Sequence, residues 1–137
     1  MAHPIVEKIL RDGLGSVRLE MLSPEAREPL MRQAGRALLN SNRLAEAAEA
    51  FARGNVMDEL RVQGEWLREQ GRLADAALFL RHVDREDALR RLAEDCIGIG
   101  EIEAARAIYE TLGDAAMLSF LQENFAAWGP TAPFLNH

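Results

Sequence analysis

Few residues in this sequence have the type and spacing that enzyme chemistry requires. The three histidines, His3, His82 and His137, are far apart, and none has the His-x-x-x-His or Glu-x-x-His spacing that places two metal ligands on one helix face. The carboxylates lie beside arginines or at expected helix starts, as on a solvated helical surface, and no two form an evident acid and base pair. We therefore expect no metal site, no cofactor and no enzymatic activity.

Two further features have plain structural interpretations. Residues 13–16, Gly-Leu-Gly-Ser, are similar to part of a phosphate-binding loop, but they lack a third glycine or a lysine and do not follow a strand. We interpret them as a turn. Cys96 is the only cysteine, and its position is filled by Leu38 and Leu67 at intervals of 29 residues, which favours a buried small hydrophobic residue over a nucleophile.

The most informative polar residues are three arginines, Arg32, Arg61 and Arg90, which recur at intervals of 29 residues. In one interpretation each arginine pairs with a carboxylate three or four residues away in its own helix, an exposed pair that contributes about 0.3 kcal/mol. The pairs expected in this way are Arg61 with Asp58 or Glu65, and Arg90 with Asp87 or Glu94. In the other interpretation the arginines contact a ligand.

The composition limits the classes of function. A chain of 137 residues with 48% apolar and 28% charged residues is expected to form one folded domain. Its formal net charge of -6 disfavours strong nucleic-acid binding. No apolar run is predicted to be long enough to span a membrane, and no secretion signal is predicted. A single cysteine cannot form an internal disulfide. These observations favour a cytoplasmic protein that is held together by packing.

An internal repeat predicts the elements that carry these residues. Three similar segments each begin with a turn residue and continue into an alanine-rich stretch; they are residues 42–48, 71–77 and 100–106. Large residues recur at the same spacing, as at Met31, Leu60 and Leu89. The period of 29 residues divides the chain into repeat units. These are an amino-terminal cap helix and connector (1–27), three units (28–56, 57–85 and 86–114), a closing helix (115–127) and an irregular tail (128–137).

Each unit is predicted to contain two helices, A and B. In the second unit Asn55 is the expected N-cap of helix A, and helix B is expected from about 73 to 82. Asp84 and Asp87 are expected to repeat the cap before the next helix A. Helix A should end before Asn42, Gly71 and Gly100, three residues that tolerate the left-handed conformation. Recurring small residues should let helices A and B approach closely; they are Gly35, Gly64 and Ala93 on helix A, and Ala47, Ala76 and Ala105 on helix B.

The segment before the repeats is less regular. A short helix is predicted from His3 to Asp12 with a stop at Gly13, followed by a connector or short helix over residues 16–22. Ser23 and Pro24 favour the start of a further helix, in which Pro29 predicts a kink near residue 28.

The order of large, small and large residues on helix A (Leu60, Gly64, Leu67), followed by Leu73, Ala76 and Leu80 on helix B, resembles the tetratricopeptide repeat (TPR). The resemblance covers about 87 of the 137 residues. The period is shorter than the family's value of about 34, the usual proline is absent, and clathrin-type helical hairpins are an equally good comparison. The resemblance implies an all-α fold, a right-handed α-solenoid of about three and a half stacked antiparallel hairpins.

The resemblance also gives the arginines a possible role. In TPR proteins the equivalent face of helix A lines a concave groove that receives a partner peptide. The groove residues implied here are Arg32, Arg36, Arg61, Glu65, Arg68, Arg90 and Glu94, together with Leu39 and Ile97. The specific Lys and Asn residues of the family's carboxylate clamp are not reproduced.

Two functions follow from these expectations. The first is a non-enzymatic protein-interaction module or scaffold that binds a partner protein or peptide in the groove of the A helices, with no nucleic-acid or membrane partner. The alternative is a structural homo-oligomer that assembles through the ends of the solenoid or through the apolar tail residues Trp128, Phe134 and Leu135.

Overall fold

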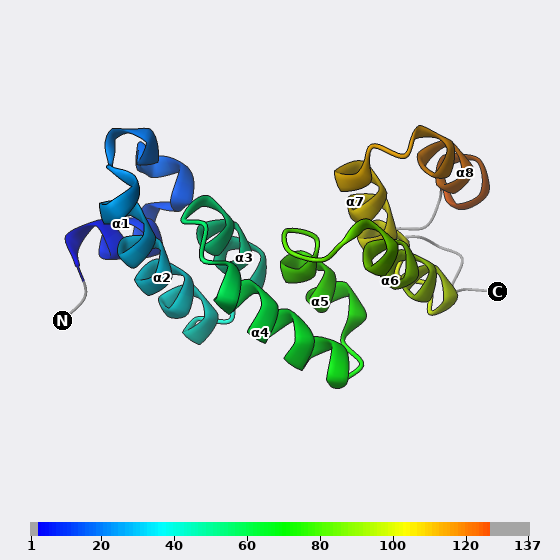
Figure 1. Cartoon of the computed structure of the whole chain (residues 1–137), viewed down its shortest axis with the longest axis horizontal. Coiled ribbons are helices and arrows are strands. Elements are labelled where there is room, and N and C mark those ends of the chain that lie inside the picture. The colour runs from blue at the N-terminus through cyan, green and yellow to red at the C-terminus, as the bar shows by residue number, and fades with distance from the viewer. Residues whose placement is uncertain (1–2, 127–137) are drawn as a thin grey trace.

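A computed structural model of the chain describes residues 3–126. Within this range the protein is all-α, as predicted, with eight α-helices, two short 3-10 turns and no strand (Figure 1). The helices are α1 (Pro4–Asp12), α2 (Pro24–Asn40), α3 (Leu44–Arg53), α4 (Met57–Glu69), α5 (Leu73–Leu80), α6 (Glu86–Gly98), α7 (Ile102–Leu112) and α8 (Ala115–Phe125). None of the helices in the described part is both long and apolar enough to cross a lipid bilayer.

Consecutive helices pack in pairs. Helix α2 packs on α3, α4 on α5 and α6 on α7, while α1 covers α2 and α8 packs on α7. Helix α3 also contacts α5, and α5 contacts α7, so the second helices of neighbouring pairs lie side by side. Figure 1 shows α1 and α8 at opposite ends of an elongated molecule. We call α2, α4, α6 and α8 the A helices, and α3, α5 and α7 the B helices.

The turns between A and B helices follow the sequence closely. Asn42, Gly71 and Gly100 all have the predicted left-handed conformation, with φ of 58°, 77° and 83°. Asn55 also has a φ of 58°, so it forms the turn before α4 and is not the expected N-cap, a position that Val56 occupies. The expected caps at Asp84 and Asp87 are likewise wrong, because Arg85 is the N-cap of α6 and caps it with no side-chain hydrogen bond.

Some helix ends differ from their predicted positions. Helix α5 ends at Leu80 and not near residue 82, because the amides of His82 and Val83 bond to carbonyls three residues earlier and form a tight turn. Helix α8 ends at Phe125, and the last predicted residue of the closing helix, 127, lies outside the described range together with the tail.

The amino-terminal helix is confirmed as α1, which ends at Asp12 with Gly13 as its C-cap, where φ is 94°. The connector forms two 3-10 turns, Leu14–Ser16 and Leu19–Met21. Helix α2 begins at the N-cap Ser23, whose hydroxyl accepts a hydrogen bond from the Ala26 amide at 3.2 Å. It continues through the exposed Pro29, so the predicted unit boundary at residue 28 falls inside a helix.

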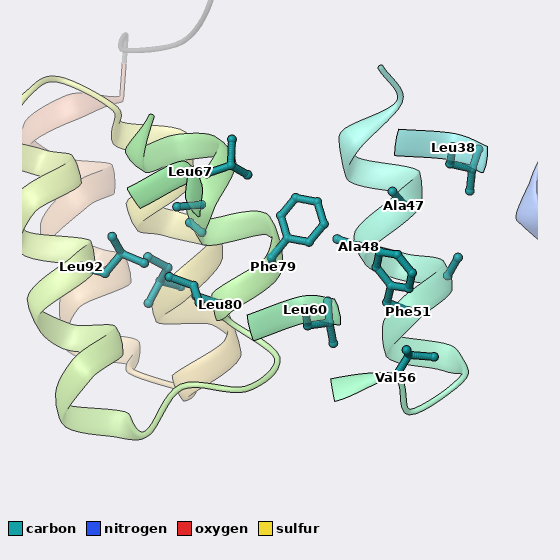
Figure 2. Close-up of a cluster of buried hydrophobic side chains, with 14 of the residues drawn as sticks. Leu38, Ala47, Ala48, Phe51, Val56, Leu60, Leu67, Phe79, Leu80 and Leu92 are labelled. Atoms are coloured by element: carbon teal, nitrogen blue, oxygen red, sulfur yellow. The ribbon is translucent and has the colours of Figure 1, made fainter. Parts of the chain in front are cut away.

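The core is a continuous row of apolar side chains between the helices, and within the described residues it contains no buried polar or charged side chain. Figure 2 shows Phe51 and Phe79 among leucines and alanines contributed by several helices. The close approach predicted from small residues is confirmed: a Cβ atom at Gly35 would overlap the ring of Phe51, and one at Gly64 would overlap the side chain of Leu80. These glycines let α2 and α4 lie directly against a large side chain of their B helices.

Candidate functional site: the cleft between helices α4 and α6

The three recurring arginines connect one A helix to the start of the next. Arg32 on α2 donates to Asp58 on α4 at 2.9 and 3.1 Å. Arg61 on α4 donates to Asp84, in the turn before α6, at 3.3 Å. In the third pair, Arg90 on α6 donates to Asp114, the N-cap of α8, at 2.5 Å.

The pairs expected within one helix are therefore corrected. Arg61 contacts Asp84 instead of Asp58 or Glu65, and Arg90 contacts Asp114 and Glu86 instead of Asp87 or Glu94. Two pairs do lie within one helix, as the first interpretation expects: Arg32 with Glu28 and Arg90 with Glu86. The partners Asp58, Asp84 and Asp114 were missed because they lie 23 to 26 residues away along the chain. Sequence spacing within one helix cannot predict such distances.

Side-chain hydrogen bonds are the main cause of the pKa shifts at these bridges. The side-chain bond from Arg32 lowers the pKa of Asp58, and the bond from Arg90 lowers the pKa of Asp114. The same bonds raise the pKa of both arginines. Since the side chains are partly open to water, each bridge is expected to contribute little to the free energy of unfolding. Arg32 and Arg90 are thereby occupied in holding neighbouring A helices together.

The residues around Arg61 have a different geometry. Between α4 and the start of α6 lies an open cleft of about 310 Å³. Its lining residues are Arg61, Glu65, Arg68, Asp84, Arg85, Asp87, Ala88 and Arg91. A second depression of about 220 Å³ shares Arg68, Ala88 and Arg91 with the first and extends to Leu73, Leu92 and Asp95. Together these residues form what we call the α4–α6 cleft.

Helical periodicity positions the α4 wall of the cleft. Arg61, Glu65 and Arg68 are spaced by four and three residues, which places them along one side of the helix. The adjacent stripe of α4, which includes Leu60 and Leu67, is buried against the B helices. The three polar side chains are therefore held at the edge of the core and face the start of α6.

Asp84 fixes two of the arginines in the cleft. Its side chain is only 6% exposed, and it accepts hydrogen bonds from Arg68 at 2.8 Å and from Arg61 at 3.3 Å. Arg61 also donates to the carbonyl oxygen of Val83 at 3.1 Å. One carboxylate thus serves two guanidinium groups, and Glu65 lies 3.9 Å from Arg68 as a second, looser partner. Because four arginines and three carboxylates line this cleft, one positive charge is left in excess.

Two arginines on the α6 side of the cleft have positive charges that neighbouring carboxylates balance only weakly. Arg85 forms no ion pair in the described part of the chain. Arg91 is 74% exposed and lies 3.8 Å from Asp87, which is itself 70% exposed. Both guanidinium groups are accessible to a bound molecule.

The structure divides the predicted groove residues among separate places. Arg61, Glu65 and Arg68 come together in the α4–α6 cleft. Arg32 and Arg36 lie between α2 and α4, where Arg36 pairs with Glu59 at 2.5 Å. Arg90 lies toward α8, and Glu94 is exposed on α6. The self-association residues Trp128, Phe134 and Leu135 lie outside the described range.

Sequence reasoning missed Asp84, Arg85, Ala88 and Arg91 as members of the site. Asp84 was interpreted as a helix cap, and residues 56 and 62, one period before Arg85 and Arg91, are both valine. The signal that was available is a run of four charged residues, Asp-Arg-Glu-Asp at 84–87, in the segment between a B helix and the next A helix.

Other reactive groups stand apart from the cleft. Cys96 is fully buried, and burial raises the pKa of its thiol to about 11. The Ser16 hydroxyl donates to the Gly13 carbonyl at 2.6 Å within the turn predicted for residues 13–16. The described residues include no group of three or more His, Cys, Asp or Glu side chains arranged to hold a metal ion.

Comparisons with protein-family models, with curated proteins and with solved structures found no match to this chain.

Proposed function

We propose that this chain is a non-enzymatic protein-interaction module, a TPR-like α-solenoid whose A helices bind a peptide or helix of a partner protein. The observation that carries the proposal is the α4–α6 cleft, in which Arg61, Glu65 and Arg68 line one open depression together with side chains of α6. The pairwise packing of A and B helices and the contacts of α5 with α3 and α7 support the stacked-hairpin arrangement. A cytoplasmic location is part of the proposal, and the buried free thiol of Cys96 supports it.

The cleft has the properties of a binding surface. It is open to solvent, its polar groups are long arginines and short carboxylates, and its walls belong to two different helix pairs that neighbouring contacts hold in place. Rigid helices that present side chains along a shared depression suit an extended or helical peptide, because such a ligand can contact several residues without a large rearrangement.

The experiment that tests the proposal is selection of peptides from a random-sequence display library on the full chain. We expect enriched peptides that bind wild type and lose binding to Ala88→Trp, which fills the centre of the cleft. The matched control is Glu110→Trp, on the exposed surface of α7. Circular dichroism verifies that both variants are folded, and Ala88→Gln replaces the tryptophan if it is not tolerated.

Two results would contradict the proposal. One is the absence of enriched peptides. The other is a set of peptides that bind Ala88→Trp as well as wild type, since these would occupy another surface.

Assembly into a homo-oligomer is a second candidate, favoured by one observation on α8. Met31, Leu60 and Leu89 are at most 3% exposed, whereas Leu118, one period further on, is only partly buried. Phe120 on the same helix is 45% exposed. If a second copy covers this end, sedimentation should show a dimer that Phe120→Glu disrupts and Ser119→Glu does not. A monomer at high concentration would contradict this alternative.

A further inference from the structure

The α4–α6 cleft carries an excess of guanidinium groups at one end. Four arginines line its wider part, against the three carboxylates of Glu65, Asp84 and Asp87. Asp84 is shared by Arg61 and Arg68, and the Nε of Arg68 is buried with no hydrogen-bond partner in the part of the chain that the structure describes. Among residues 3–126 Arg85 has no ion-pair partner, so the unmatched positive charge lies at the start of α6.

The other end of the cleft is partly apolar. Beyond Arg68, Ala88 and Arg91, its lining includes Leu73, at the start of α5, and Leu92, on α6. Leu92 is 3% exposed and forms part of the core, while Leu73 is half-buried against it. An apolar side chain placed here would cover the half-buried Leu73 and the side chain of Ala88, and the removal of this apolar surface from water favours binding. Asp95 is the one carboxylate at this end.

We propose that the α4–α6 cleft selects a partner segment with carboxylates at one end and an apolar side chain at the other. This inference rests on the proposed function and adds the chemistry of the partner. The carboxylates would bind Arg85 and Arg91, and Arg91 would exchange its loose contact with Asp87 for a closer charge-assisted pair. The apolar side chain would lie over Ala88 beside Leu73 and Leu92.

Charge complementarity separates this partner from others. A basic segment would meet Arg85 and Arg91, while each carboxylate in the wider part of the cleft already lies near an arginine: Asp84 near Arg61 and Arg68, Glu65 at 3.9 Å from Arg68, and Asp87 at 3.8 Å from Arg91. A nucleic acid would bring phosphates to Arg85 but would face a protein of net charge -6. Leu73 and Leu92, at the other end of the cleft, offer a phosphate group no favourable contact.

The test uses the display library described above, with the charges of the selected peptides as the first readout. The two strongest peptides are then labelled with fluorescein, and their binding to the full chain is measured by fluorescence anisotropy. The test variant is Arg85→Glu with Arg91→Glu. The matched control is Arg11→Glu with Arg18→Glu, which makes the same change of charge at exposed positions away from the cleft.

We expect selected peptides to combine Asp or Glu with Leu, Ile, Val or Phe. Their affinity should fall about tenfold or more in the test variant, fall less than about threefold in the control, and weaken as salt is added. Replacing the acidic residues of a selected peptide by Gln or Asn should have the same effect as the test variant.

Three outcomes overturn the inference and have different meanings for the proposed function. If the selected peptides are basic or uncharged but lose binding to Ala88→Trp, the acidic partner is refuted and the proposed interaction module is not. Equal loss in the test variant and the control would show a long-range charge effect and not a site. If no peptide binds, and a labelled single-stranded DNA oligonucleotide binds at Arg85 and Arg91, both the inference and the proposed function are refuted.

Discussion

Replacement of Gly35 by Ala tests whether the A and B helices are held at a distance that only glycine permits. The added Cβ would lie 2.5 Å from Cδ1 and 2.6 Å from Cζ of Phe51, where ordinary contacts are 3.4–4 Å. The ring is 0% exposed and cannot turn into solvent, so the ring or the helix must move by about 1 Å.

Two opposing effects determine how much Gly35→Ala changes the free energy of unfolding. Alanine in place of glycine favours the helix by about 1 kcal/mol. Insertion of a methyl group into a filled core costs about 1–3 kcal/mol, and the upper part of that range applies because an aromatic ring is rigid. We expect Gly35→Ala to lower the free energy of unfolding by about 2 kcal/mol, which for a chain of this size lowers the Tm by about 8 °C.

Thermal denaturation followed by circular dichroism measures the change. Gly98→Ala is the matched control, because a Cβ atom at Gly98 meets nothing within 4 Å. The control should raise the Tm by about 2–4 °C through helix propensity alone. Combining Gly35→Ala with Phe51→Leu should recover part of the lost stability relative to Phe51→Leu by itself. A Tm for Gly35→Ala at or above that of wild type would refute the close packing of α2 on α3.

Three further predictions concern titratable groups. Asp84→Asn should lower the free energy of unfolding by about 1–2 kcal/mol, because Arg61 and Arg68 lose a charged acceptor but keep access to water; chemical denaturation measures it, and no change would refute the bridging role of Asp84. Burial lowers the pKa of His82 below its ordinary value of 6.5, so the unfolded chain binds the proton more readily. Stability should therefore fall as the pH drops through 6.5 toward the folded pKa, and His82→Gln should flatten this part of a Tm-against-pH curve; an identical slope in the variant would contradict the assignment. Cys96 should react with a thiol reagent only as fast as the protein opens, because its thiol is fully buried with a pKa raised to about 11; rapid labelling of the native protein would contradict its burial.

Much of the fold was predictable because local physics determines it. The left-handed turns at Asn42, Gly71 and Gly100 follow from residue type, and the burial of Cys96 follows from its register with Leu38 and Leu67. The same local reasoning failed at Asn55, which has the residue type of a cap but the conformation of a turn. The predicted helix start at Ser23 and Pro24 is confirmed, whereas the unit boundary at residue 28, which was drawn from the repeat period, falls inside α2.

The candidate site was less predictable because it depends on contacts between repeats. The prediction that Arg61, Glu65 and Arg68 lie along one side of α4 was correct. The other residues that line the cleft do not occupy equivalent positions in the repeat, so the period could not predict them. Asp84 illustrates the difficulty: in the sequence it is a polar residue before a helix, while in the fold it is a nearly buried acceptor for two arginines of the preceding A helix. Only the packing of α4 against the turn before α6 distinguishes the two roles.

The most direct test of the central claim is an NMR titration of the isotopically labelled full chain with a peptide selected by display. If the α4–α6 cleft is the binding site, backbone amide shifts should concentrate at residues 61–68 and 84–92, and should be absent at these positions in Ala88→Trp. Shifts confined to the B helices or to α8 would contradict the account and would place the partner on another face of the protein.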